Sequence, residues 1–161
     1  MLRSVMESIR PTQATKLARL INPHRAITCA TFSKDVPLDL NKRSVRFIEV
    51  LPDLSEDGLI QCTLSHGTVG DDEYMCLSYV WGSAKDIQQI MINGEQFPAQ
   101  KNIWTFLNAA RHAHQYPATA RRLYWIDALC IDQGNIKERN HQVGHMGAIY
   151  AAARHVVIWM G

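Results

Sequence analysis

The chain has 161 residues, of which 47% are hydrophobic and 20% are charged, and its formal net charge is +2. This length suits one domain with a real core, and the composition is that of an ordinary soluble globular protein. The weak positive charge argues against a nucleic-acid partner, and no apolar run approaches the roughly 20 residues of a membrane span, so we expect no membrane partner.

Residues 1–36 are predicted to be a basic leader, partly disordered or helical. Up to Lys34 they carry six Lys or Arg and a single acid, Glu7. An acid-poor, basic N-terminus could also be an organelle transit peptide, but it lacks the apolar core of a secretory signal. The cysteines form no CxxC pair and mostly lie in apolar runs, which indicates buried free thiols in a reducing compartment. We therefore expect a cytoplasmic protein.

The next part of the chain shows short strand patterns. Residues 44–51 alternate apolar and polar positions, residues 59–64 form a second strand, and the turn residues between them favour a hairpin, which could pack on the edge of a main sheet. Residues 74–81 have the pattern of a buried strand. Residues 89–92 followed by Asn93-Gly94 predict a hairpin arm, because Asn-Gly favours a type I′ turn.

A helix is predicted over residues 103–115. Asn102 is its expected N-cap, its apolar residues recur on one face, and Pro117 ends it.

The segment 123–161 carries the strongest pattern, which is strand, loop, helix, strand. Leu123–Ile131 is apolar except for Asp127, as expected for a strand buried on both faces. Asp132–Asn135 supplies a turn and an N-cap, and apolar residues then recur at helical spacing, including Ile136, Val143, Met146, Ile149 and Tyr150. Val156–Trp159 is a second β-branched strand, so a parallel βαβ unit is expected.

These elements predict an α/β fold with a mostly parallel sheet, flanking helices and an N-terminal β-hairpin. The chain stops at the end of a strand, where a further helix would be expected to cover the sheet. It therefore has the pattern of a chain truncated at its C-terminus.

Ligands of open parallel sheets bind beyond the carboxyl ends of the strands. Two loops are placed there, and the candidate ligand-binding residues are Trp81, Gly82, Ser83 and Lys85 in the first and Asp132, Gln133 and, from the following helix, Arg139 in the second. Neither loop has a phosphate-binding fingerprint. Trp81 could stack on a ligand or could simply pack in the core, and Arg139 could clamp the loop before it.

Two carboxylates are the candidate catalytic residues, Asp127 and Glu138. A buried carboxylate needs a partner or its pKa rises, so Asp127 could serve as a base or ribose ligand, or could form a structural ion pair with Arg121, Arg122 or Arg139. Glu138 could equally be structural at the helix N-terminus. His141 and His145 have zinc-compatible spacing, but Gln142 stands where an HExxH motif has glutamate, so we expect no metal.

Two blocks of the sequence resemble a known family. The block YMCLSYVWG (residues 74–82) resembles the "ALSYxWG" block of the fungal heterokaryon incompatibility (HET) domain, and residues 123–161 resemble its second block. The matching residues of that second block are Trp125, Ile126, Asp127, Ala128, Leu129, Cys130, Ile131, Gln133, Glu138, Arg139, Gln142, Val143, Met146, Ile149, Tyr150, Ala152, Trp159 and Gly161. With a similar lead-in strand, the resemblance covers residues 37–161. Asp132 and Asn135 depart from it, since the family commonly has the amide first and the acid second.

The resemblance implies a module of fungal nonself recognition and programmed cell death, acting through self-association or contacts with partner proteins. HET domains are distantly similar to Toll/interleukin-1 receptor (TIR) domains, which implies a TIR-like, flavodoxin-type layout. Because some TIR domains cleave NAD, an NAD-hydrolysing or nucleotide-binding enzyme is an alternative, with NAD as its cofactor or substrate. By that analogy the catalytic glutamate would lie beyond Gly161. A third alternative is a truncated HET fragment without a function of its own.

Overall fold

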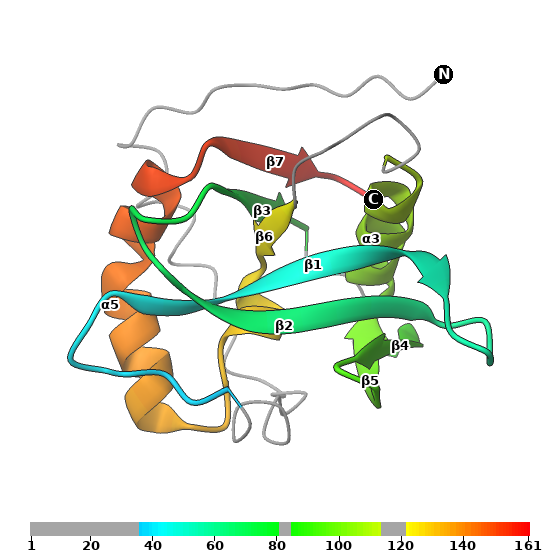
Figure 1. The fold of residues 1–161 in the computed structure, drawn as a ribbon, viewed down its shortest axis with the longest axis horizontal. Coiled ribbons are helices and arrows are strands. Elements are labelled where there is room, and N and C mark those ends of the chain that lie inside the picture. Colours follow the sequence, from blue (N-terminus) through cyan, green and yellow to red (C-terminus); the bar gives the residue numbers. More distant parts are fainter. Residues whose placement is uncertain (1–35, 81–84, 114–121) are drawn as a thin grey trace.

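The computed structural model describes residues 36–80, 85–113 and 122–161. These residues form an α/β domain with a seven-stranded mixed sheet and flanking helices (Figure 1). The strands are β1 (Ser44–Leu54), β2 (Ile60–Thr68), β3 (Tyr74–Tyr79), β4 (Ile87–Ile92), β5 (Glu95–Gln100), β6 (Leu123–Trp125) and β7 (His155–Trp159). The helices are α3 (Lys101–Ala113), the short α4 (Asp127–Cys130) and α5 (Ile136–Ala152).

The sheet is not mostly parallel, so that prediction was wrong. The strand order is β5-β4-β2-β1-β6-β3-β7, in which β2–β4, β3–β6 and β3–β7 are parallel and the other three pairs are antiparallel. The cause is the N-terminal hairpin β1–β2. It forms as predicted, but it lies in the middle of the sheet instead of on its edge, because β1 pairs with β6 and β2 pairs with β4.

The predicted βαβ unit is present within this mixed sheet. Strands β6 and β7 both run parallel to β3, which lies between them, and α5 connects the two. The second predicted hairpin, β4–β5, also forms. Asn93 (φ 50°) and Gly94 (φ 84°) both have the positive φ that a type I′ turn requires.

The strand predicted over Leu123–Ile131 is much shorter than expected. Strand β6 ends at Trp125, and Asp127 begins the short helix α4. The apolar run was a poor guide because a buried helical turn and a buried strand give the same continuous apolar pattern. Asp127 therefore lies at the start of a helix and not in the middle of a strand.

Asn102 is not the cap of α3, which begins one residue earlier at Lys101. The Asn102 side-chain amide instead donates to the Val80 carbonyl oxygen, 2.7 Å away. The predicted end at Pro117 lies outside the described residues. The helix cap predicted within residues 132–135 is confirmed, and it is Asn135, whose side chain accepts hydrogen bonds from the amides of Lys137 and Glu138.

The core lies on both sides of the central strands and is rich in aromatic contacts. Phe47 and Tyr74 stack with ring centroids 4.5 Å apart, and Trp125, fully buried, meets Tyr150 edge-on at 5.7 Å. Helix α3 packs against β1, β2, β4 and β5. In Figure 1 it lies at the opposite end of the view from α5.

Candidate functional site at the β6–α5 connection

A buried ion pair joins β1 to the start of α5. The Arg46 guanidinium donates to both Glu138 carboxylate oxygens, with Nη1–Oε1 2.6 Å and Nη2–Oε2 2.9 Å. The two side chains are 1% and 5% exposed. Such a bidentate, charge-assisted geometry is the strong form of an arginine–carboxylate contact.

The remaining polar atoms of this pair are also used. Arg46 Nη1 donates to the Cys130 carbonyl oxygen (3.1 Å), and Nε donates to that of Val36 (2.6 Å). Glu138 Oε1 also accepts from the backbone N–H of Asp132, 2.6 Å away. The Arg46–Glu138 pair therefore holds together β1, the end of α4, the loop 132–135 and the first turn of α5. This arrangement favours a structural role for Glu138.

The loop before α5 is shaped by its own side chains. The Asp132 carboxylate accepts from the backbone N–H groups of Gly134 (3.0 Å) and Asn135 (3.3 Å). Asn135 then caps α5, as described above. Asp132 thus stabilises the turn and Asn135 caps the helix. An acid at position 132 and an amide at position 135 are therefore compatible with a well-formed turn and helix start.

The buried face of α5 is partly polar, which departs from the predicted apolar stripe. Glu138, Gln142, Met146 and Ile149 are its buried residues, whereas Ile136 is 63% exposed. Val143 is likewise on the exposed side. The reason is that the first half of α5 is anchored through polar contacts, including the Gln142 amide bound to the Ser44 carbonyl oxygen at 2.9 Å.

Asp127 lies beyond the end of β6, close to the end of β3. Its Oδ1 accepts from the Tyr79 hydroxyl (3.1 Å) and from the Ala128 backbone N–H (2.7 Å). Neither Arg122 nor Arg139 pairs with it, and Arg121 lies outside the described residues. The predicted structural partner was thus of the wrong type, since a tyrosine hydroxyl takes the place of an arginine.

Burial raises the pKa of the Asp127 carboxyl group above its usual range, and the bonds from Ala128 and Tyr79 oppose that rise. Burial, with the nearby Asp127 charge, also raises the pKa of the Tyr79 and Tyr150 hydroxyls. The protonated form of Asp127 is therefore favoured in the folded protein relative to an exposed aspartate. Its protonated form is able to donate a proton, and the bonds from Tyr79 and Ala128 satisfy its Oδ1 within the core.

The structure brings together only some of the predicted site residues. The Gln133 side-chain amide approaches the backbone oxygen of Asp127 at 3.5 Å, and Asp132 is bound to Glu138. Lys85 is exposed in the turn that leads into β4. The side chain of Arg139 forms no bond to the loop 132–135. The predicted residues Trp81, Gly82 and Ser83 lie outside the described part of the chain, so their role stays a prediction.

Three cysteines, Cys62, Cys76 and Cys130, are buried and free, as predicted, while Cys29 is outside the described residues. Burial raises the pKa of the Cys62 thiol to about 12 and also that of Cys76, which disfavours reactive thiolates. The rings of His141 and His145 lie near each other, with centroids 4.4 Å apart. In the described ranges no group of three His, Cys, Asp or Glu side chains could hold a metal ion, and no helix could span a membrane.

Arg46 is the residue of this site that sequence reasoning missed. It lies between the buried residues Val45 and Phe47 in β1 and is itself only 1% exposed. A charged residue in a strand that proves to be central needs a buried partner of opposite charge. The arginine between two apolar residues was therefore a sign of a buried ion pair in the sequence. Its pairing with Glu138, 92 positions later, follows only from the placement of β1 beside β6.

Comparison with known proteins agrees with the family resemblance of residues 74–82 and 123–161. The family model described as "Heterokaryon incompatibility protein (HET)" matches residues 74–161. The chain is also similar to heterokaryon incompatibility protein 6, OR allele, of Neurospora crassa, with 29% identity over 140 residues. That match covers 81% of this chain and 21% of the relative, so the chain spans about a fifth of that protein's length. No solved structure matches the chain.

Proposed function

Because this chain belongs to the heterokaryon incompatibility (HET) family, we propose that it is a nonself-recognition module that triggers programmed cell death in fungal cells. The observation that carries the proposal is the family match over residues 74–161. The Neurospora relative, named for heterokaryon incompatibility, supports it. We place the module in the cytoplasm and infer that it signals by self-association or by contact with partner proteins.

The motif residues of the family stabilise the fold, and this supports a signalling module. Trp125 and Ile149 are fully buried, and Glu138 and Gln142 are bound to β1. Residues that recur in the motif are thus occupied in holding β1, α4 and α5 together. A domain whose motif residues serve the fold suits a role in which its surface, and not a catalytic centre, transmits the signal.

The test is induced expression of the chain in a filamentous fungus, with growth and uptake of a vital dye as the readouts. The proposal predicts growth arrest and dye uptake, and loss of both with Glu138→Gln, which weakens the fold. Glu73→Gln removes an exposed carboxylate from an ion pair that is 64% and 81% exposed, and should act like the unmodified chain. Normal growth with abundant, folded chain would contradict the proposal.

Self-association is tested separately by sedimentation velocity on the purified chain over a wide concentration range. Mass that rises with concentration is expected. A strictly monomeric chain that also captures no fungal protein would exclude both modes of signalling that we infer.

We also propose that the HET domain occupies residues 37–161, beginning well before the segment matched by the family model. The support is that β1 and β2 form the centre of the sheet, so residues 74–161 alone would leave β6 without its neighbour β1 and β4 without its neighbour β2. Limited proteolysis should yield a protected fragment that begins near residue 37. A protected fragment beginning near residue 74 would contradict this boundary.

A TIR-like layout is a further part of the proposal. It is supported by the parallel strands β6, β3 and β7 and by α5, which connects β6 to β7. An experimental structure of a chain that continues past residue 161 tests it. The layout requires the next strand to add to the sheet in parallel beside β7, and an antiparallel neighbour there would refute it.

A further inference from the structure

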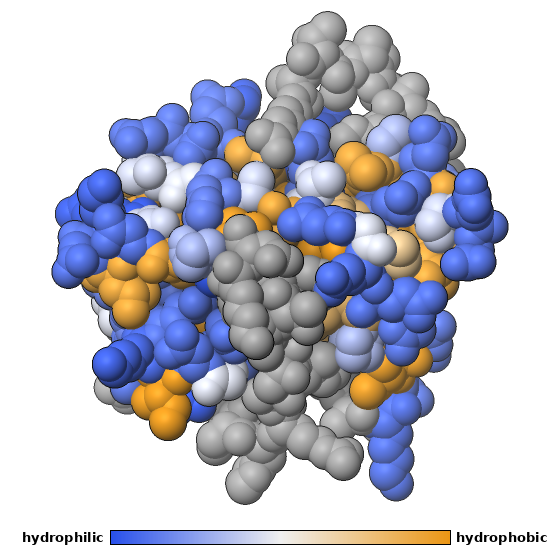
Figure 2. All heavy atoms as spheres, turned by 60° about the horizontal axis from the view of Figure 1, so that its bottom comes forward, coloured by the Kyte–Doolittle hydropathy of each residue, from blue (hydrophilic) through white to orange (hydrophobic). Residues whose placement is uncertain are grey.

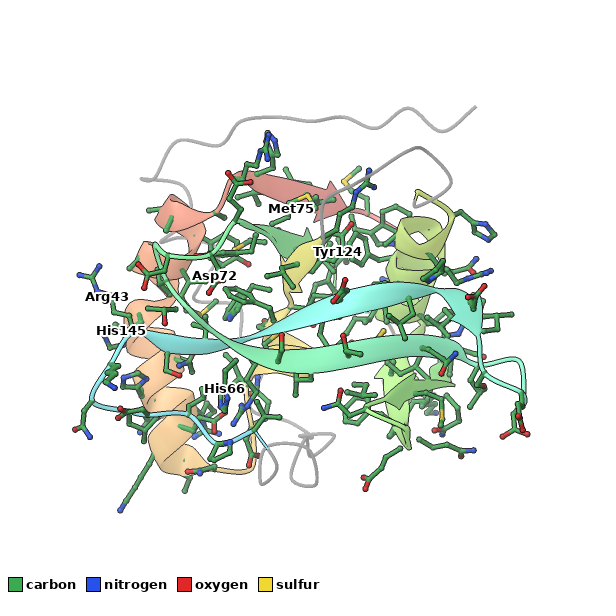
Figure 3. All side chains as sticks on the ribbon, viewed as in Figure 1. Arg43, His66, Asp72, Met75, Tyr124 and His145 are labelled. Atoms are coloured by element: carbon green, nitrogen blue, oxygen red, sulfur yellow. The ribbon has the colours of Figure 1, made fainter. Side chains whose placement is uncertain are left out.

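An open groove lies between the turn before β1, the end of β2 and the middle of α5. Its volume is about 450 Å³, and it is lined by Leu40, Asn41, Lys42, Arg43, Thr68, His141 and His145. Figure 3 shows Arg43 and His145 next to each other at the side of α5. None of these residues belongs to the candidate site described above.

The lining of this groove is rich in cations and hydrogen-bond donors and contains no carboxylate. Lys42 and Arg43 supply two positive charges, and Asn41, Thr68 and the two imidazoles add polar groups. Within the described part of the chain, the Arg43 guanidinium has no hydrogen-bond or ion-pair partner. A guanidinium with all its donors available is the group best suited to bind a phosphate in bidentate fashion.

Nearby carboxylates compete only weakly for these cations. Asp39 lies 3.4 Å from the Lys42 ammonium group, but the two side chains are 43% and 77% exposed, and such pairs contribute little. The Asp72 carboxylate keeps its charge, but its Oδ2 accepts from the Thr68 backbone N–H at 2.9 Å, and among the described residues it forms no ion pair with Lys42 or Arg43. The residues that line the groove therefore carry a net positive charge.

The wall of the groove formed by α5 is held in place. His145 Nδ1 lies 2.8 Å from the His141 carbonyl oxygen, to which it can donate, and the two rings pack at 4.4 Å. Two histidines at this spacing could in principle bind a metal ion, but the positive charges of Lys42 and Arg43 oppose a cation here. The charge of the lining favours an anion.

We propose that this groove binds a small phosphate-bearing molecule, with Arg43 as the principal phosphate ligand and Lys42 as a second, mobile cation. The groove is larger than one phosphate group and falls within the range of about 300–1,000 Å³ typical of small-molecule sites. Leu40, its apolar residue, provides a contact for the organic part of the ligand. This inference is independent of the proposed function, since it rests on the groove alone.

The test is titration of the full 161-residue chain with inorganic pyrophosphate, followed by amide chemical shifts in NMR spectra at fixed ionic strength. Saturable shifts are expected at residues 41–43, Thr68 and His141. Arg43→Gln should weaken binding roughly tenfold or more, because a charge-assisted contact is lost. Citrate, a polycarboxylate, is titrated in parallel as the comparison ligand and should bind more weakly than pyrophosphate.

Lys137→Gln is the matched control, because it removes one positive charge from an exposed position of α5 outside the groove. It should leave binding unchanged. Circular dichroism establishes that each variant is folded, and His145→Gln serves as a second groove variant if Arg43→Gln fails to fold. Absence of saturable binding, or equal weakening in Arg43→Gln and Lys137→Gln, would overturn the proposal. Citrate binding as tightly as pyrophosphate would refute the phosphate class.

Discussion

Substituting Glu138 by glutamine should destabilise this domain far more than its modest chemical change suggests. Glutamine has the same shape, but its amide nitrogen would face an Arg46 nitrogen, and the guanidinium would remain 1% exposed without a counter-charge. Removing one partner of a buried ion pair typically costs about 3–5 kcal/mol. This is a large part of the roughly 5–15 kcal/mol that stabilises an ordinary domain.

The size of the effect can be read from unfolding curves. For a chain of this length, each kcal/mol lowers the melting temperature by roughly 2–4 °C, so a decrease of roughly 6–20 °C is expected. Urea unfolding followed by tryptophan fluorescence gives the free energy directly, since Trp125 is completely buried and becomes exposed on unfolding.

The control for this prediction is Glu73→Gln. Glu73 forms an ion pair with Arg154 at 2.8 Å, but both side chains are largely exposed, and such pairs contribute about 0–1 kcal/mol. If Glu138→Gln cost no more than Glu73→Gln, the reasoning that burial makes the Arg46–Glu138 pair critical would be refuted. A double variant, Arg46→Met with Glu138→Met, should recover part of the loss, because it leaves no buried charge unpaired.

Other substitutions test separate parts of the fold. Gly144→Ala should stabilise the protein by up to about 1 kcal/mol in thermal unfolding, because α5 has open space there; a loss would mean that this face is covered. Gly67→Ala should destabilise it by about 1–3 kcal/mol in urea, since the new methyl group would overlap the Phe47 ring. Asn135→Ala should cost about 1 kcal/mol of helix capping, measured in the same way. Asp127→Asn should change how the free energy of unfolding depends on pH. Because the pKa of Asp127 is raised in the folded protein, the folded state loses stability as pH rises above about 4 and through the folded pKa. The variant should lack this loss, which unfolding curves taken across acidic pH would measure. An unchanged pH profile would show that Asp127 is not buried as described.

Local chemistry was a good guide where a residue acts on its own neighbours. The Asn93-Gly94 turn and a helix cap within residues 132–135 were predicted from residue type, and both form, because each depends on only a few adjacent backbone groups. The segment 123–131 was assigned wrongly because a buried strand and a buried helical turn show the same apolar run. Periodicity cannot separate them at that length.

The partners of the buried charges could not be read from the sequence. Asp127 was expected to meet an arginine and meets Tyr79, and Glu138 was placed correctly at a helix start without its partner Arg46. These contacts join positions 48 and 92 residues apart. They exist because β1 was inserted beside β6, and β6 beside β3.

The sequence by itself determined the family, the α/β composition, the two hairpins and the start of a helix after the loop 132–135. Each of these is encoded within a short stretch, by turn chemistry, apolar periodicity or motif spacing. Only the tertiary structure decided the mixed sheet, the central position of the β1–β2 hairpin and the groove beside Arg43. The physical reason is that strand order depends on contacts between segments far apart in the sequence, such as β1 with β6 and β2 with β4, and no single segment encodes these contacts.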